Sequence, residues 1–270
     1  MLDVSRYLVP PNTRVVLADY DPNAKTGFEE GKKAGKKALP PLNERLSELQ
    51  RRLWAESEQS LLVVIQAIDT GGKDSTIRKV FSGVNPQGVR VASFGVPNER
   101  ELAHDYLWRI HRETPPDGHI KIFNRSHYED VLVARVKELV SEEAWSRRYR
   151  HIREFERMLA EEGTRIVKIF LHISKDEQRE RLQDRLDEPD KNWKFNKADL
   201  ADRALWEDYQ RAFEDALSET STEHGPWYVV PANRKWYRNL VVSTILIETL
   251  EDMGPQYPEP EEDLDEVEIE

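Results

Sequence analysis

Short runs of apolar residues alternate along this chain with longer stretches in which apolar residues recur every three or four positions. The runs predict five buried strands, at residues 61–65, 89–96, 120–123, 165–173 and 227–230. The stretches predict helices at residues 42–58, 97–113, 131–139, 142–161, 175–186, 198–220 and 235–253, with one more after residue 74. Strands that alternate with helices indicate an α/β fold, and we expect three α/β/α layers around a five-stranded parallel sheet.

The first strand runs directly into a glycine-rich turn with the sequence AIDTGGKD, residues 67–74. A strand, a glycine turn and a helix start present backbone N–H groups to a phosphate, and Lys73 adds a mobile charge. Against the P-loop pattern G-x-x-x-x-G-K-[ST], Ala67 replaces the first glycine and Asp74 replaces the hydroxyl residue. Asp69 and Asp74 therefore flank the lysine, which is intelligible if they bind a metal ion. The alternative is a plain turn with Asp74 or Ser75 as the helix N-cap and Lys73 in solvent.

A second polar segment, NRSHYED at residues 124–130, follows the third predicted strand. It resembles the Asp-Arg-x element of thymidylate-kinase-like enzymes, whose arginine holds an acceptor phosphate, and Arg125 is suited to that role. Glu129 and Asp130 stand at the start of the next predicted helix, where acidic residues complement the helix dipole. Alternatively, Asp130 shares a metal ion with Asp69. Ligand sites of parallel sheets lie at the carboxyl ends of strands, so we expect both polar segments to converge.

Basic residues gather at three further places. Arg78 and Lys79 follow the glycine turn by about one helical turn, and either extend a phosphate track or are solvated. Arg181 and Arg185 share a helix face and lead into a basic loop with Lys191 and Lys194, which predicts a lid over phosphates or else a basic surface loop. Two further residues, Phe94 and Pro97, are candidates for a base pocket or for the core.

Composition narrows the class of protein. The 270 residues include no cysteine, which excludes disulfides and thiolate chemistry, and no apolar run approaches the length of a membrane span. The net charge is −11, but the final twelve residues hold eight acids, so the remainder carries 40 basic against 43 acidic residues. We expect a cytoplasmic protein with a basic N-terminal arm (residues 1–40) and a disordered acidic tail (259–270). Local basic clusters on an acidic protein favour a small polyanionic ligand over nucleic acid.

With these residues in place, the chain resembles the family-2 polyphosphate kinases, which are P-loop enzymes of thymidylate-kinase-like fold. The resemblance rests on LLVVIQAIDTGGKD, NPQGVRVASFGVP, HDYLWRIHRE, IFNRSHYEDVLVARV, FLHISKDEQRERLQDRL, WKFNKADL and PWYVVPANRKWYRNL. It implies transfer of the terminal phosphoryl group of polyphosphate to AMP and ADP, with Mg²⁺, or Mn²⁺ in its place. It implies a kinase domain over residues 41–258 with a helical lid at about 181–200. Adenine nucleotides are the expected acceptors, with guanine nucleotides as an option, and a homo-oligomer (dimer or tetramer) is the expected assembly.

The resemblance also implies roles for individual residues. Catalysis is implied for Asp69, Lys73 and Arg125. Binding of phosphate or polyphosphate is implied for Thr70, Gly71, Gly72, Asp74, Ser75, Arg78, Lys79, Arg181, Arg185, Lys191 and Lys194. Nucleotide binding is implied for Phe94, Pro97, Asn124, Arg125, Ser126 and Glu129, and metal binding for Asp69, Glu129 and Asp130. The family commonly has two alanines where this chain has Thr70 and Gly71, and glycine where it has Ser75.

Two other functions stay open. One is an ATP-dependent nucleoside-monophosphate kinase of the same fold, against which the missing P-loop glycine and hydroxyl argue. The other is a non-catalytic polyphosphate-binding protein, against which Asp69 argues, because phosphate affinity alone does not call for a carboxylate.

Overall fold

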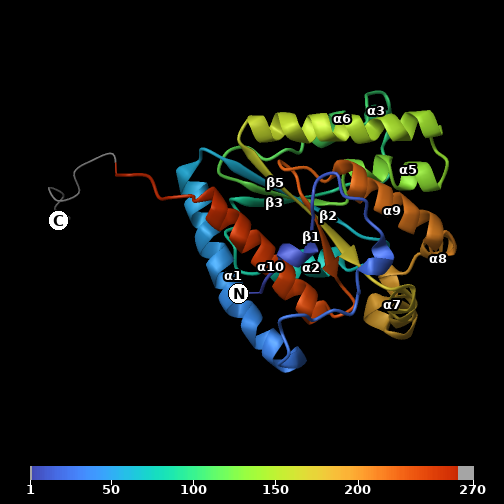
Figure 1. The fold of residues 1–270 in the computed structure, drawn as a ribbon, viewed down its shortest axis with the longest axis horizontal. Coiled ribbons are helices and arrows are strands. Elements are labelled where there is room, and N and C mark those ends of the chain that lie inside the picture. The colour runs from blue at the N-terminus through green and yellow to red at the C-terminus, as the bar shows by residue number, and fades with distance from the viewer. Residues whose placement is uncertain (1, 261–270) are drawn as a thin grey trace.

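A six-stranded sheet forms the centre of the molecule (Figure 1). The computed structural model describes residues 2–260. The strands are β1 (Leu8–Val9), β2 (Ser60–Gln66), β3 (Val89–Ser93), β4 (Ile120–Asn124), β5 (Thr164–His172) and β6 (Trp227–Pro231). Their order across the sheet is β1-β6-β5-β2-β4-β3, and β1 alone pairs antiparallel, with β6. The sheet is therefore mixed and mostly parallel.

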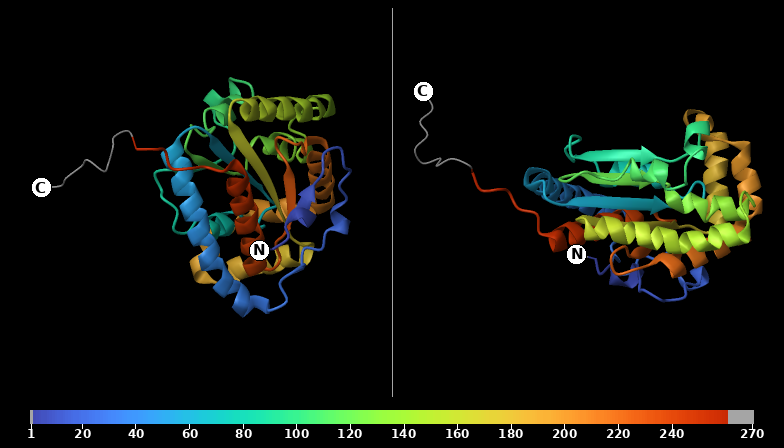
Figure 2. Two further views of the ribbon diagram at one scale, coloured as in Figure 1. Left: turned by 60° about the vertical axis from the view of Figure 1, so that its left-hand side comes forward. Right: turned by 90° about the horizontal axis from the view of Figure 1, so that it is seen from above.

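Helices cover the sheet. They are α1 (Gly31–Glu56), α2 (Lys73–Val80), α3 (Glu99–Leu102), α4 (Trp108–His111), α5 (Val133–Val136), α6 (Glu142–Glu161), α7 (Lys175–Asp187), α8 (Lys197–Ala204), α9 (Trp206–Thr220) and α10 (Lys235–Met253). Short 3-10 helices are η1 (Ser5–Tyr7), η2 (Leu17–Asp19), η3 (His127–Asp130) and η4 (Pro189–Lys194). In Figures 1 and 2, α1 runs beside α10, whereas α6 packs on β5 and α9 away from them.

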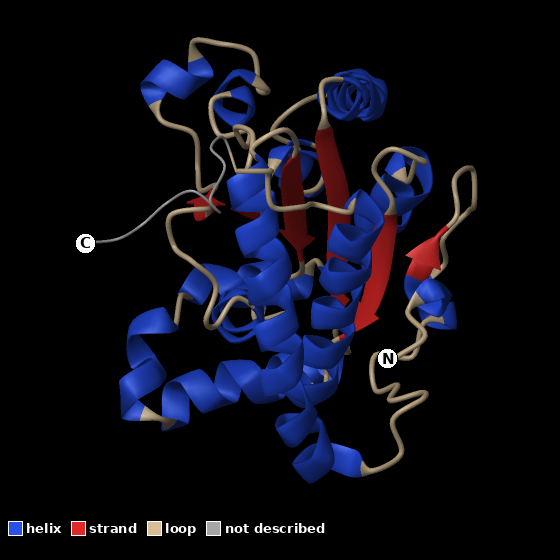
Figure 3. Cartoon of the chain, turned by 90° about the vertical axis from the view of Figure 1, so that its left-hand side faces the viewer, coloured by secondary structure: helices blue, strands red, loops and turns tan. Residues whose placement is uncertain are grey.

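The core lies where continuous apolar sequence meets the sheet. All seven residues of β2 are buried, as expected for a strand covered on both faces. Helix α10 is apolar nearly all round from residue 240 to 247, and it is correspondingly buried against β5, β6, α1 and α2. Figure 3 shows the strands enclosed by helices.

All five predicted strands are present, but the prediction of a five-stranded parallel sheet is wrong because the sheet has a sixth strand, which is antiparallel. The additional strand β1 has two residues, Leu8 and Val9, which pair with Tyr228 and Trp227 at the sheet edge. Two residues followed by two prolines carry no periodicity, so only the pairing with β6 defines this strand.

The predicted start of the first helix is also wrong. Helix α1 begins at Gly31 rather than at residue 42, so four lysines of the predicted basic arm lie on a helix that contains Pro40 and Pro41: Lys32, Lys33, Lys36 and Lys37. The prolines remove two backbone donors, but packing on α10 holds the helix: a side chain at buried Gly35 would approach Trp236 within 2.2 Å.

Two predicted helices are broken. The 97–113 stretch forms α3 and α4, because the Asp105 side chain accepts the Leu107 N–H at 3.0 Å and turns the chain. The 198–220 stretch breaks at Leu205 into α8 and α9. The predicted acidic tail lies outside the described residues from position 261 onward. Within residues 2–260, no helix has the length and apolarity that a bilayer crossing needs.

Candidate active site

The carboxyl ends of β2 and β4 lie side by side, and both predicted polar segments leave the sheet there. Ile65 of β2 pairs with Asn124 of β4, and the Arg125 N–H donates to the Ile65 carbonyl at 3.2 Å. Arg125 then takes a left-handed backbone conformation, with φ of 62°. The predicted convergence is confirmed: an Arg125 Nη2 to Asp69 Oδ1 hydrogen bond of 2.7 Å joins the two segments.

The glycine turn, residues 67–72, is tightly wound. Gly72 is the N-cap of α2 with φ of 102°, and Thr70 has φ of 64°, which is uncommon for a β-branched residue and indicates stored strain. A Cβ on Gly71 would lie 2.4 Å from the Ala67 Cβ, so Gly71 has no room for a side chain. Neither Asp74 nor Ser75 is the N-cap, and the plain-turn alternative is wrong on that point.

Charged side chains of the two segments form one cluster. Lys73 folds back over the turn, where its Nζ donates to the Ala67 carbonyl at 3.0 Å. Burial, with the nearby Arg125 charge, lowers the pKa of Lys73. Burial raises the pKa of Glu129, whose Oε2 lies 3.7 Å from Arg125 Nη1. Asp74 accepts a 2.8 Å hydrogen bond from Asn124 Nδ2. The cluster therefore sets two cations, Lys73 and Arg125, beside three carboxylates, Asp69, Asp74 and Glu129, at the strand ends.

The carboxylates of this cluster fit a hard divalent cation. Mg²⁺ in such sites takes one or two carboxylates and completes its shell with substrate phosphates and water. Asp69 and Glu129 both lie beside Arg125. The hydrogen bond from Arg125 goes to Oδ1 of Asp69, and Oδ2 of the same carboxylate takes no part in it. In residues 2–260, no group of three or more acidic, histidine or cysteine residues forms a self-sufficient metal cage.

Asp130 does not belong to this cluster. Its carbonyl and Oδ1 accept from Arg148 Nη1 of α6, at 2.9 and 3.4 Å. The prediction that Asp130 shares a metal with Asp69 is therefore not supported, because its ion pair is made with α6 rather than with the glycine turn.

Arg181 of α7 forms hydrogen bonds with the backbone of the glycine turn. Its side chain is buried, and Nη1 donates to the carbonyls of Thr70 and Gly71, both at 3.0 Å. Nη2 donates to Ala232 and Asn233, and Nε donates to Glu177. These bonds use all five guanidinium N–H groups, so the predicted phosphate contact of Arg181 is replaced by a structural one. Gln178, which the sequence reasoning missed, likewise donates to the Asp69 carbonyl at 3.2 Å.

The predicted lid residues Arg185, Lys191 and Lys194 form contacts within residues 185–199. Arg185 donates to Asp199 Oδ2 at 2.7 Å and to the Lys194 carbonyl at 3.1 Å. The Lys194 ammonium lies over the exposed Trp193 ring, and Lys191 pairs with Glu188. Burial, with the Asp69 charge, raises the pKa of Asp199 at the start of α8.

A large basic groove adjoins the glycine turn. It encloses about 1230 Å³ between α1, α2 and the start of α10. Its lining holds two acids, Glu44 and Glu177, and eight basic residues: Lys32, Lys36, Arg51, Arg78, Lys79, Arg234, Lys235 and Arg238. Arg78 and Lys79 are thus brought into one surface with the lysines of α1. Such a surface favours an anion with several charges.

Arg238 is a groove residue that the sequence reasoning missed. Its side chain is fully buried, and Nη2 donates to Ser75 Oγ at 3.1 Å and to Asn239 Oδ1 at 2.8 Å. Nη1 lies 2.2 Å from the position that a Cβ on Gly72 would take, and has no hydrogen-bond partner among the described residues. Its signal in the sequence is a charged residue among the apolar positions of a buried helix.

Comparison with known proteins identifies the family. The family model "Polyphosphate kinase 2 (PPK2)" matches residues 29–258. The chain belongs to the polyphosphate kinase 2 family. The AMP/ADP-polyphosphate phosphotransferase of Meiothermus ruber is 62% identical over 258 residues, covering 96% of this chain and 97% of that protein. The ADP-polyphosphate phosphotransferase of Rhodopseudomonas palustris is 49% identical, covering 86% and 84%. The crystal structure of polyphosphate kinase 2 from Arthrobacter aurescens superposes with a TM-score of 0.93 at 42% identity, covering 97% and 93%.

In this polyphosphate kinase 2 member, the remaining predicted nucleotide contacts differ in exposure. Ser126 is fully buried and accepts from Gln66 Nε2 at 3.1 Å. Phe94 is buried edge-to-face against Phe123, with ring centroids 5.0 Å apart, so only its rim is open to a ligand. Pro97 is half-buried in the loop before α3.

Proposed function

We propose that this protein transfers the terminal phosphoryl group of inorganic polyphosphate to AMP and ADP, which yields ADP and ATP, in a reversible reaction. The observation that carries the proposal is the eight-cation groove, which is lined by Ser75 of α2 and by Arg238, whose Nη1 lies beside Gly72 of the glycine turn. A nucleotide triphosphate tail needs only a few cations, whereas a long polyanion needs a continuous series of them. The groove therefore favours polyphosphate as the donor over ATP.

The charged cluster at the strand ends suits phosphoryl transfer. Such a reaction depends on positioning and on neutralising charge at donor, transferred group and acceptor. Gly72 and Lys73 hold the terminal phosphates, and Arg125 holds the acceptor phosphate by its planar fork. The 2.7 Å contact of Arg125 with Asp69 keeps the acceptor side beside the donor side.

Asp69 and Glu129 are the residues that would hold Mg²⁺, or Mn²⁺ in its place. When bound, the ion neutralises phosphate charge and polarises the phosphoryl group. The contribution of the chain is to orient the two carboxylates, which Arg125 does by contacting both. We assign Glu129 to the acceptor side, where it supports AMP as well as ADP as an acceptor.

One assay separates this proposal from its rivals. Purified protein is incubated with Mg²⁺, AMP and polyphosphate in the absence of ATP, and nucleotides are separated by chromatography. We expect ADP and then ATP. Product with ATP alone as donor would identify a nucleoside-monophosphate kinase, and polyphosphate binding without turnover would identify a binding protein.

The Asp69→Asn variant tests the assignment within the site. We expect turnover to fall by about 10²–10³-fold, because the amide cannot replace a charged metal ligand, while polyphosphate still binds. Asp252→Asn, at the exposed end of α10, is the matched control and keeps wild-type turnover. Full activity in Asp69→Asn would refute the metal assignment.

Three further features complete the proposal. Residues 41–258 form the kinase domain of thymidylate-kinase-like type, and residues 181–200 close as a lid when substrate binds. Lid closure is measurable as protection of residues 189–196 from hydrogen exchange on addition of polyphosphate. We also infer a homo-oligomer, supported by apolar exposure near the β3 edge at Val96 (96%) and Leu102 (69%), and testable by light scattering.

A further inference from the structure

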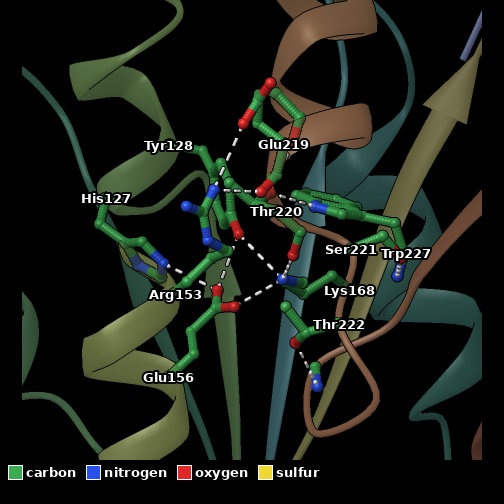
Figure 4. A network of polar contacts seen from close by, with 12 residues as sticks. His127, Tyr128, Arg153, Glu156, Lys168, Glu219, Thr220, Ser221, Thr222 and Trp227 are labelled. Carbon is green, nitrogen blue, oxygen red and sulfur yellow. Dashed lines mark hydrogen bonds and ion pairs between the residues drawn. The ribbon is translucent and has the colours of Figure 1, made fainter. Parts of the chain in front are cut away.

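A fully buried ion pair contacts His127 and Tyr128, which lie between Arg125 and Glu129 in the chain (Figure 4). Glu156 of α6 and Lys168 of β5 are both 0% exposed, with Lys168 Nζ at 2.5 Å from Glu156 Oε2. Buried charges are rarely retained for stability alone, because an apolar pair of similar volume is often as stable. The pair therefore calls for a role other than stability.

The hydrogen bonds of this pair are saturated. Lys168 Nζ donates to Glu156, to the Tyr128 hydroxyl at 2.9 Å and to the Thr220 carbonyl at 2.7 Å. Glu156 Oε1 accepts from the Tyr128 hydroxyl at 2.8 Å and contacts His127 Nε2 at 3.1 Å. Tyr128 thus closes a ring with both charges, and the geometry of that ring is fixed from several sides.

His127 and Tyr128 stand between the residues that face the substrates. Arg125 precedes them and Glu129 follows them in the same short segment. The segment is secured at its other side by Ser126, whose hydroxyl accepts from Gln66 Nε2 and from the Tyr128 N–H. The Glu129 N–H donates to the Ser126 carbonyl at 3.1 Å. Tyr128 is therefore connected to Arg125 and Glu129 through a short segment that is hydrogen-bonded on both sides.

We propose that the Glu156–Lys168 pair positions the acceptor segment, residues 125–129, so that Arg125 and Glu129 hold the acceptor phosphate in line with the donor. This inference rests on the proposed function, since it assigns the pair to the nucleotide side of that reaction. Glu156, Lys168 and Tyr128 act through other residues and touch no substrate. The donor groove is lined by α1, α2 and α10 and does not depend on the pair.

The test uses Tyr128→Phe, which keeps the ring and removes only the hydroxyl, and Glu156→Gln. We expect the KM and the calorimetric dissociation constant for AMP to rise about tenfold, with the KM for polyphosphate within about twofold of wild type. Glu154→Gln, in the exposed Arg150–Glu154 pair of the same helix, is the control and leaves both values unchanged.

A double variant separates positioning from folding. Glu156→Gln with Lys168→Met removes both charges, and we expect it to unfold at a higher temperature than Glu156→Gln alone while AMP affinity stays low. Wild-type AMP affinity in a folded Tyr128→Phe protein and in the double variant would overturn the inference, as would equal losses for AMP and polyphosphate. Failure of the proposed function is seen separately, as wild-type protein that binds AMP but forms no ADP from polyphosphate.

Discussion

Replacement of Gly72 by alanine tests how the glycine turn is held. Gly72 has φ of 102°, a conformation that costs a residue with a Cβ about 1–2 kcal/mol. The new Cβ would also lie 2.2 Å from Arg238 Nη1, and overpacking of that kind costs about 1–3 kcal/mol more. We therefore expect Gly72→Ala to lower the free energy of unfolding by about 2–5 kcal/mol.

Gly163 provides the matched control. Its φ of 91° is similar, but the atom nearest to the position of its Cβ, the Glu58 carbonyl oxygen, lies 3.9 Å away. Gly163→Ala should lose only the backbone contribution of about 1–2 kcal/mol and keep its activity. Gly72→Ala should also lose about 100-fold in turnover, because Arg238 and the turn must shift by a large part of an ångström. Urea denaturation followed by circular dichroism, with a transfer assay, measures both. Equal destabilisation of the two variants, with activity retained in both, would refute the contact between Arg238 and Gly72.

Three more predictions concern the titration of His172 and of Lys73 and the hydrogen bonds of Arg181. Burial lowers the pKa of His172 to about 4, so the unfolded chain binds a proton first as pH falls from 6.5 toward 4, and stability should drop by about 3 kcal/mol across that window. Urea denaturation of the wild type and of His172→Gln at each pH measures this loss as the difference in their free energies of unfolding. The same dependence of stability on pH in both proteins would contradict the prediction. The lowered pKa of Lys73 predicts that polyphosphate affinity starts to fall, as pH rises, before the usual pKa of a lysine is reached, whereas Lys73→Arg should bind without that alkaline decline in a titration calorimeter. Arg181→Lys should lower the free energy of unfolding by about 1–3 kcal/mol, because an ammonium cannot reach all the carbonyls that the guanidinium serves, and denaturant titration measures it.

The sequence predicts best the elements whose pattern is local. Helix α10 has the predicted bounds, and the five long strands lie within a few residues of their predicted positions, because continuous apolar runs are self-sufficient signals. The meeting of the two polar segments was also predictable, since the carboxyl ends of neighbouring parallel strands lie at the same edge of the sheet. Asp69 and Arg125 are 56 positions apart and form a hydrogen bond.

Tertiary contacts account for what the sequence did not predict. The start of α1 depends on Gly35 fitting beneath Trp236, about two hundred positions away. The role of Arg181 depends on backbone carbonyls, which are present at every residue and therefore carry no signal in a sequence. Its spacing from Arg185 correctly predicted a shared helix, but the one arginine turns inward to the glycine turn and the other pairs with Asp199.

The departures of the glycine turn from the P-loop pattern can be explained together with two buried arginines that contact it, Arg181 and Arg238. Ala67 fills the space that a glycine would leave, and its Cβ excludes a side chain at Gly71. Arg181 donates hydrogen bonds to carbonyls of the turn, and Arg238 of α10 donates to Ser75.

Arg238 lacks the counter-charge that Arg181 has. Arg181 pairs with Glu177 at 2.7 Å, whereas the Arg238 guanidinium donates to the neutral side chains of Ser75 and Asn239. Burial, together with the Arg181 charge, lowers the pKa of Arg238 to about 9, which means that the protein itself compensates this cation poorly. A phosphate bound at Gly72 would supply the missing counter-charge and raise that pKa again.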